Sequence, residues 1–188
     1  NAILMPYMPV LMMASMANTE AFLAGETMPY LIFGILGACV QIGGAGNTLG
    51  LCIATLFAKS EKYKAMRKLV IPANIFNINE PVIFGAPIAF NPIFFIPFVF
   101  LPGLLATSTV LLMEAGIIAM PTIGMVPWTL PPGLIGFFMT GGAISTTVWS
   151  ILIVVITIAV YYPFFRVADK QQYEKELQES KELDNQTI

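Results

Sequence analysis

Histidine is absent from this chain of 188 residues, and charged side chains make up only 11% of it. The absence of histidine removes the commonest proton carrier and metal ligand of proteins. Cysteine is also scarce: Cys39 and Cys52 are the only two, and both lie within apolar sequence, so neither a disulfide framework nor a metal cluster is indicated. We therefore predict no metal and no cofactor, and we expect both cysteines to be small, buried side chains.

The scarcity of basic residues excludes a nucleic-acid-binding surface. The net charge is −2, and no basic face is available to neutralise phosphates. Hydrophobic residues instead make up 57% of the chain and the mean hydropathy is +0.79, far from the values of a soluble globular protein. Several long apolar runs follow one another, which a soluble core does not explain. The composition predicts an all-α polytopic membrane protein.

The basic residues indicate the orientation of the chain. All nine Lys and Arg fall into two clusters, at 59–68 and 166–181. The positive-inside rule places both clusters on the cytoplasmic side of the membrane. Glu20 and Glu26 lie in NTEAFLAGET without a basic neighbour, and we predict that this sequence is an external loop.

Two apolar runs, at about 91–113 and about 143–165, each approach the ~20 residues that a bilayer requires. Residues 28–58 are expected to cross once more, with an interruption in the glycine-rich sequence at 43–50. Residues 69 and 165 each adjoin a cytoplasmic basic cluster, so the chain between them must cross the membrane an even number of times. The two long apolar runs supply these crossings, and we therefore predict that 69–90 enters the membrane and returns to the same side. The proline-rich stretch 114–142 is predicted to be a second re-entrant or broken segment.

The two ends of the chain differ in character. Residues 2–18 are apolar but contain Pro6 and Pro9, and they could form either a short span or the returning arm of a hairpin. Residues 166–188 are polar and favour a helix, with Lys170/Glu174 and Lys175/Glu179 spaced i,i+4. We predict a solvated cytoplasmic tail that frays at its end, in preference to a specific docking site.

The most informative polar residue is Glu80, in the motif FNINEP, because no other charged residue occurs between Leu69 and Met113. An ionisable group at membrane depth usually faces protein or a water-filled cavity and marks a functional site. Asn77 and Asn79 accompany it, and Pro72 and Pro81 are predicted to break the helix on either side. Broken backbone beside buried polar groups is how transporters form substrate sites.

This cluster has the chemistry of a sugar site. A carboxylate accepts hydrogen bonds from hydroxyl groups, and amides both donate and accept them. The Glu80 carboxylate can also act as a general base toward a hydroxyl that becomes a nucleophile. The alternative is a glutamate that pairs internally and holds a broken helix together. We favour substrate binding by Asn77, Asn79 and Glu80, with Glu80 buried and catalytic.

Two further motifs are candidates. The sequence GGAGNTLG at 43–50 lacks the Lys-Ser/Thr of a phosphate loop, and its glycines serve either close helix packing or close approach to a ligand. Its Asn47 and Thr48 could donate to a substrate or to a neighbouring carbonyl. Trp128, in VPWTLPPG, could stack on a sugar ring, although its spacing alone favours a tryptophan at the membrane interface. We expect Trp149 to serve packing or the interface, and Glu114 to be solvated on the outside.

Several of these strings together resemble a known family. IFNINEPVIFGAPIAFNPIFFIPF at 75–98 resembles enzyme IIC, the membrane subunit of the bacterial phosphoenolpyruvate-dependent sugar phosphotransferase system, in its lactose/cellobiose/diacetylchitobiose family. GGAGNTLGL, the basic KSEKYKAMRK loop, VPWTLPPGLIGFFMTGG and YYPFFRVADKQQ are similar to the same family in the same order. The resemblance implies a multi-pass protein of the bacterial cell membrane with a cytoplasmic C-terminus. It further implies that residues 1–165 are the C-terminal part of an enzyme IIC transport domain, cut from a longer protein, and that 166–188 are its tail.

The resemblance also implies a function. Enzyme IIC binds a disaccharide of the cellobiose, diacetylchitobiose or lactose type and carries it inward by an elevator-like movement. A phosphocysteine of the separate enzyme IIB then phosphorylates the sugar at its 6-hydroxyl. On this resemblance Glu80 bonds and deprotonates that hydroxyl, Asn77 and Asn79 shape the site, and Trp128 stacks on the sugar. The implied partners are the disaccharide, phosphorylated enzyme IIB, membrane lipid and, for the full-length protein, a second copy.

Two other functions are compatible with the residues. One is a non-transporting remnant that binds only a sugar or a partner, because the active-site histidine and the dimer helices of the family lie outside this chain. The other is a secondary transporter that uses Glu80 for protons or cations. Its activity would follow an ion gradient and ignore phosphoenolpyruvate, and the NINEP motif argues against it.

Overall fold

The computed structural model describes residues 8–26, 29–30, 42–86, 88, 91–122 and 126–186. Within these residues the secondary structure is helical and no strand occurs, which confirms the predicted all-α class. The elements, in chain order, are α1 (Met8–Ala24), α3 (Leu49–Ala54), the 3-10 turn η2 (Thr55–Phe57), α4 (Glu61–Ile75), α5 (Glu80–Gly85), α6 (Pro92–Glu114), α7 (Leu134–Met139) and α8 (Ile144–Gln186).

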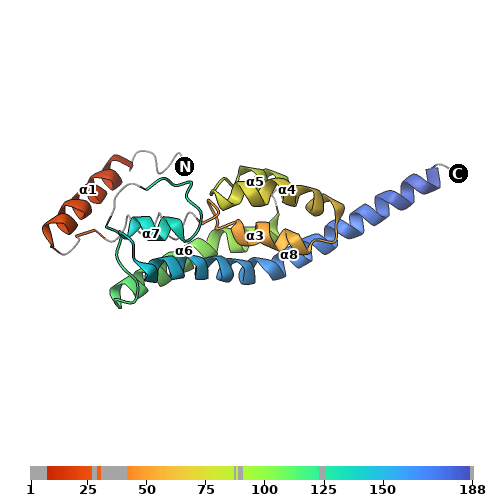
Figure 1. Cartoon of the computed structure of the whole chain (residues 1–188). Helices are drawn as coiled ribbons and strands as arrows, with labels where there is room; N and C mark the ends of the chain where they lie inside the picture. The colour runs from red at the N-terminus through yellow and green to blue at the C-terminus, as the bar shows by residue number, and fades with distance from the viewer. Residues whose placement is uncertain are drawn as a thin grey trace.

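Two helices are long and apolar enough to cross a membrane: α6, and α8 over Ile144–Asn185. The sequence predicted spans at 91–113 and 143–165, so the start of each helix agrees within a residue. At the start of α6, Asn91 Oδ1 accepts a hydrogen bond from the Ile93 amide at 3.0 Å, as an N-cap residue does. Helix α8 does not end with its apolar part but continues without interruption through the polar tail (Figure 1).

The short helix α3 lies against α8, and this contact centres on a glycine. A Cβ atom on Gly50 would lie 2.3 Å from the carbonyl carbon of Thr157, so the two backbones touch directly. One turn further along α8, the Tyr161 hydroxyl donates to the Gly46 carbonyl at 2.6 Å. The Trp149 indole donates to Thr109 Oγ1 at 2.8 Å and joins α8 to α6, which confirms a packing role for Trp149.

The polar part of α8 holds the N-terminus of α4. The buried carboxylate of Asp169 accepts hydrogen bonds from the amides of Lys59 (2.8 Å) and Ser60 (3.1 Å) and from the Ser60 hydroxyl (2.8 Å). Seven residues later, Glu176 accepts from the amides of Glu61 (2.8 Å) and Lys62 (3.1 Å). These four successive amides, at residues 59–62, lie at the start of α4, where backbone N–H groups have no acceptor within the helix. Two carboxylates of α8 supply the acceptors instead. We call these two carboxylates the α8 clasp.

The structure confirms some of the other predictions about the tail and the loops and contradicts one of them. The predicted Lys170–Glu174 pair forms, with an N–O distance of 3.8 Å. The predicted external loop NTEAFLAGET is wrong at its start, because α1 continues to Ala24 on good helix formers and ends at Gly25, whose φ is +74°. Glu114 is exposed at the end of α6, as expected. Residues 28 and 31–41 of the predicted span 28–58, with Cys39 among them, lie outside the described residues, whereas Cys52 is fully buried as predicted.

The two prolines around the NINEP motif do not act as predicted. Pro72 lies inside α4, which continues for three more residues to Ile75, so the helix does not break at this proline. Pro81 occupies the first turn of α5, where proline is favoured because its missing N–H has no partner in the helix anyway. The chain is broken instead at residues 76–79, between the two helices.

Candidate functional site

The NINEP motif forms a turn between α4 and α5. Asn77 has a φ of +63°, in the left-handed region that asparagine tolerates better than most residues. Backbone hydrogen bonds close the turn, from Asn77 N to Asn74 O at 3.0 Å and from Ile78 N to Ala73 O at 3.1 Å. The turn ends at Asn79, and Glu80 is the first residue of α5.

The Asn77 side chain connects three segments that are far apart in the sequence. Its Oδ1 accepts a hydrogen bond from the Gly43 amide at 2.7 Å. Its Nδ2 donates to the carbonyls of Trp128 at 2.6 Å and Leu130 at 3.0 Å. The glycine-rich loop 42–48, the NINEP turn and the loop 126–130 therefore meet at one asparagine.

Further bonds fix the glycine-rich loop to α4 and to the NINEP turn. Thr48 Oγ1 donates to the Gly43 carbonyl at 2.6 Å and accepts from Asn74 Nδ2 at 3.0 Å. Asn79 Nδ2 donates to the Ala45 carbonyl at 2.8 Å. Thr48 and Asn47 are both fully buried within the chain. Their predicted contact with substrate stays a prediction, and the bonds of Thr48 serve the shape of the loop.

The glycines of this loop serve close packing. A Cβ on Gly44 would lie 2.6 Å from Asn79 Cγ, and a Cβ on Gly46 would lie 2.2 Å from the ring of Phe98. Both glycines also have positive φ angles, which favour glycine. Of the two roles that the sequence left open, the structure therefore supports packing against protein.

Glu80 and Trp128 differ from the asparagines in being exposed. The Trp128 side chain is 55% exposed, and Glu80 is exposed rather than buried, contrary to the expectation from the sequence. The reason is its place at the start of α5, where Val82, and not Glu80, faces the core. Among the residues that the structure describes, the Glu80 carboxylate has no hydrogen-bonding or ionic partner. Glu80 therefore does not hold the broken helix together; Asn77 and Asn79 do.

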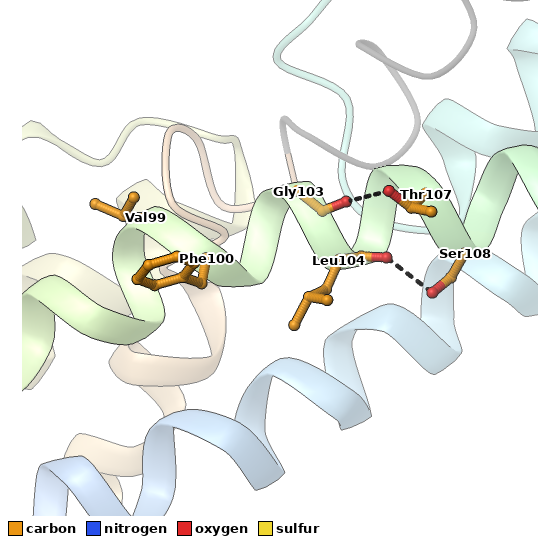
Figure 2. Close-up of a pocket in the computed structure, with 6 residues that line it drawn as sticks. All are labelled: Val99, Phe100, Gly103, Leu104, Thr107 and Ser108. Carbon is orange, nitrogen blue, oxygen red and sulfur yellow. Dashed lines mark hydrogen bonds between the residues drawn. The ribbon is translucent and has the colours of Figure 1, made fainter.

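A second candidate lies on α6 and has different chemistry. An open depression of about 350 Å³ is lined by Val99, Phe100, Gly103, Leu104, Thr107 and Ser108 (Figure 2). Its two hydroxyl groups donate to carbonyls of their own helix, Thr107 to Gly103 at 2.9 Å and Ser108 to Leu104 at 2.8 Å. Such bonds satisfy the hydroxyl donors locally. The surface suits an apolar contact better than a polyhydroxylated ligand.

Sequence reasoning missed Asn74 and the carbonyl groups of the site. Asn74 is fully buried and bonds Thr48, and its position three residues before Asn77 in the apolar C-terminal part of α4 was the available signal. The carbonyls of Gly43, Ala45, Trp128 and Leu130 carry no side-chain signal. Their role emerges only when the three segments are brought together.

The family assignment follows from this site and from comparison with known proteins. Residues 2–102 match the family model "Phosphotransferase system, EIIC", which covers more than half of the chain. The chain belongs to this family. EIIC proteins are membrane-embedded components of the phosphotransferase system, in agreement with the two apolar helices α6 and α8. The resemblance inferred from the sequence is thereby confirmed.

Individual EIIC relatives are substantially similar to the chain. The lichenan permease IIC component of Bacillus subtilis (strain 168) is 42% identical over 163 residues, which are 85% of this chain and 36% of the relative. The galactose-specific EIIC component of Lactococcus lactis subsp. cremoris (strain MG1363) is 41% identical, over 92% of this chain and 38% of its own length. A lactose-specific EIICB component of Staphylococcus haemolyticus (strain JCSC1435) is 33% identical over 95% of the chain and 31% of the relative.

A solved structure has the same fold. The crystal structure of the transporter ChbC, the IIC component of an N,N'-diacetylchitobiose-specific phosphotransferase system, superimposes with a TM-score of 0.85 at 35% sequence identity. The match covers 89% of this chain and 39% of ChbC. The chain thus spans a little over a third of the length of this structure and of the lichenan- and galactose-specific relatives.

Proposed function

We propose that this EIIC chain contributes the sugar-binding site of a disaccharide permease whose substrate is phosphorylated by an EIIB protein. The observation that carries the proposal is the division of labour at the NINEP turn. Asn77 and Asn79 bind backbone carbonyls and hold the turn, while the Glu80 carboxylate and the Trp128 ring are exposed and uncommitted. The Trp128 backbone is bonded to the turn that precedes Glu80. A carboxylate and an aromatic ring together can recognise a sugar by its hydroxyl groups and by its apolar ring face.

The substrate class is inferred from the relatives. Their names specify lichenan, cellobiose, oligo-β-mannoside, lactose, diacetylchitobiose and, in one relative, galactose; all of these except galactose are β-linked sugars. We infer a disaccharide of this kind for the present chain. The EIICB relatives join a B component to the C component in one protein, which supports phosphorylated EIIB as the partner.

The proposed chemistry at Glu80 is proton removal during phosphoryl transfer. The Glu80 carboxylate accepts the proton of the sugar 6-hydroxyl while the hydroxyl oxygen attacks the phosphorus of the EIIB phosphocysteine. An oxygen–phosphorus bond forms, the sulfur–phosphorus bond breaks, and the cysteine leaves as a thiolate. Asn79 orients the sugar from the end of the turn. Asn47 and Thr48, which are buried, maintain the glycine-rich loop behind it.

Orientation in the membrane and assembly complete the proposal. The α8 clasp holds the basic N-terminal half of α4 next to the basic tail, so both clusters lie on one side of the membrane, which we take to be the cytoplasmic side. Residues 1–165 would then belong to the transport domain, and 166–188 to a cytoplasmic extension. Membrane lipid and a second copy of the full-length protein are the remaining expected partners.

Uptake of labelled cellobiose, lactose and diacetylchitobiose tests this function. Bacterial cells without their own permease would carry either the chain itself or a chimaera in which the chain replaces the matching region of the lichenan permease. Each would be tested with and without EIIB. We expect uptake by the chimaera only when EIIB is present, and no effect of a protonophore applied while phosphoenolpyruvate is maintained. Uptake that follows the proton gradient and ignores EIIB would contradict the proposal.

A further inference from the structure

We propose that Asn77 is a positioning residue: it does not contact the sugar but fixes the loop that carries Trp128 to the turn that precedes Glu80. This inference rests on the proposed function and refines it. It separates Asn77 from Asn79, which the motif alone treats alike.

The first argument is that the polar capacity of Asn77 is almost fully used within the chain. An asparagine amide nitrogen has two hydrogens to donate. One is donated to the Trp128 carbonyl and the other to the Leu130 carbonyl, while Oδ1 accepts from the Gly43 amide. The side chain is only 5% exposed. Neither hydrogen remains for a sugar hydroxyl.

The second argument is that the Trp128 loop depends on these bonds. Among the described residues, Asn77 supplies the only side-chain hydrogen bonds that reach residues 126–130. Within the loop, the Leu130 amide donates to the Pro127 carbonyl at 3.2 Å, a long bond. The two carbonyls that Asn77 binds lie on either side of Thr129, so the bonds fix both the position and the direction of the backbone that carries the exposed indole.

The third argument is the contrast with Asn79. Its Nδ2 donates to the Ala45 carbonyl, and its Oδ1 makes no hydrogen bond within the described part of the chain. Both asparagines are buried, at 5% and 7% exposure, so the contrast lies in their hydrogen bonds. Asn79 anchors the glycine-rich loop and still has an acceptor and a second donor hydrogen that are not used within the described part of the chain. The two asparagines hold different loops, and only Asn77 holds the one with the tryptophan.

The test uses Asn77→Asp in the chain, purified in lipid nanodiscs. Aspartate keeps an acceptor for the Gly43 amide and tolerates a left-handed backbone, but it removes both donors to the loop. The matched control is Asn91→Asp, which makes the same chemical change at the α6 N-cap, where Oδ1 accepts from Ile93 and aspartate serves equally well. All proteins also carry Trp149→Phe, which leaves Trp128 as the only tryptophan of the chain.

The first readout needs no sugar. Acrylamide quenching and the emission maximum of Trp128 should change with Asn77→Asp and stay unchanged with Asn91→Asp. Unchanged Trp128 fluorescence in the folded Asn77→Asp protein would overturn the proposal. If that variant does not fold, Asn77→Gly replaces it, because glycine keeps the left-handed backbone without adding charge. The same change in Trp128 fluorescence is expected for Asn77→Gly, and unchanged fluorescence in this variant would also overturn the proposal.

The second readout is disaccharide affinity in a double-mutant cycle with Trp128→Ala. Asn77→Asp should weaken binding about two- to tenfold, the loss expected when an aromatic contact is misplaced. It should cause little further loss when Trp128 is already alanine, because both changes remove the same contact. If Asn77→Asp weakens binding just as much in the Trp128→Ala protein, Asn77 contacts the sugar directly and the proposal is overturned. If the unsubstituted chain binds no disaccharide, the proposed function fails, while the fluorescence readout still decides the role of Asn77.

Discussion

Gly50→Ala tests the contact on which the site is built, that of α3 against α8. The new Cβ would lie 2.3 Å from the carbonyl carbon of Thr157 and 2.5 Å from its oxygen, both of them backbone atoms. Ordinary van der Waals contact needs roughly 3.4 Å or more, so α3 must retreat from α8 by about 1 Å. Overpacking of this kind costs about 1–3 kcal/mol.

The preference of alanine over glycine in a helix works in the opposite direction. Alanine stabilises a helix by about 1 kcal/mol relative to glycine, so the net loss for Gly50→Ala is about 0–2 kcal/mol. Gly103→Ala is the matched control, since it lies in α6 and a Cβ there would meet no atom within 4 Å. The difference between the two variants therefore isolates the overpacking, about 1–3 kcal/mol.

Thermal unfolding of the two variants in the same detergent, followed by circular dichroism, measures this difference. For a chain of this size it corresponds to a Tm lower by about 2–12 °C for Gly50→Ala than for Gly103→Ala. Equal Tm values for the two variants would refute the close approach of α3 and α8. The glycine at position 50 would then need another explanation.

Three further predictions follow from the site and the clasp. Trp128→Ala should weaken disaccharide binding by ~1 kcal/mol or more without loss of folding, whereas Trp149→Phe, which removes an internal hydrogen bond, should leave affinity unchanged; titration calorimetry compares them. Asp169→Leu leaves buried amides without an acceptor, and we expect a loss of stability of about 1–3 kcal/mol, measured by chemical denaturation; stability equal to wild type would exclude the clasp. Partial desolvation opposes ionisation of Glu176, in the polar part of α8, but the hydrogen bonds from the α4 amides prevail and lower its pKa. The stability that ionised Glu176 contributes is then fully present above pH 4.5 and is lost as the pH falls through the lowered pKa. Hydrogen exchange of the amides at the start of α4, corrected for intrinsic rates, should therefore accelerate in acid in the wild type but not in Glu176→Gln.

The sequence predicted the long helices well because their signal is local. Helix α6 begins one residue after its predicted start, where Asn91 caps it and Pro92 occupies the first turn. The apolar run alone could not give the end of α8, since the polar tail favours the same helical conformation as the span before it. The tail is held by Asp169 and Glu176 through contacts with a segment more than 100 residues earlier, which no local pattern reveals.

The candidate site was located by sequence, but its internal roles were not. A single carboxylate in a long apolar stretch marked Glu80, and the neighbouring asparagines marked the turn. The exposure of Glu80 could not be predicted, because hydropathy does not tell which face of a six-residue helix packs inward. Asn77 acts mostly on backbone carbonyls of distant loops, and carbonyls have no signature in the sequence.

The rate of sugar phosphorylation by the chimaera with Glu80→Gln tests the central claim most directly. Phosphorylated EIIB and labelled disaccharide would be supplied in excess, and the product counted. Glutamine keeps the size of the side chain but cannot accept the proton, so we expect normal expression and folding, moderately weaker binding and a rate lower by about 10²–10⁴-fold. A rate equal to that of the unsubstituted chimaera would remove Glu80 from the reaction and contradict the account of the site.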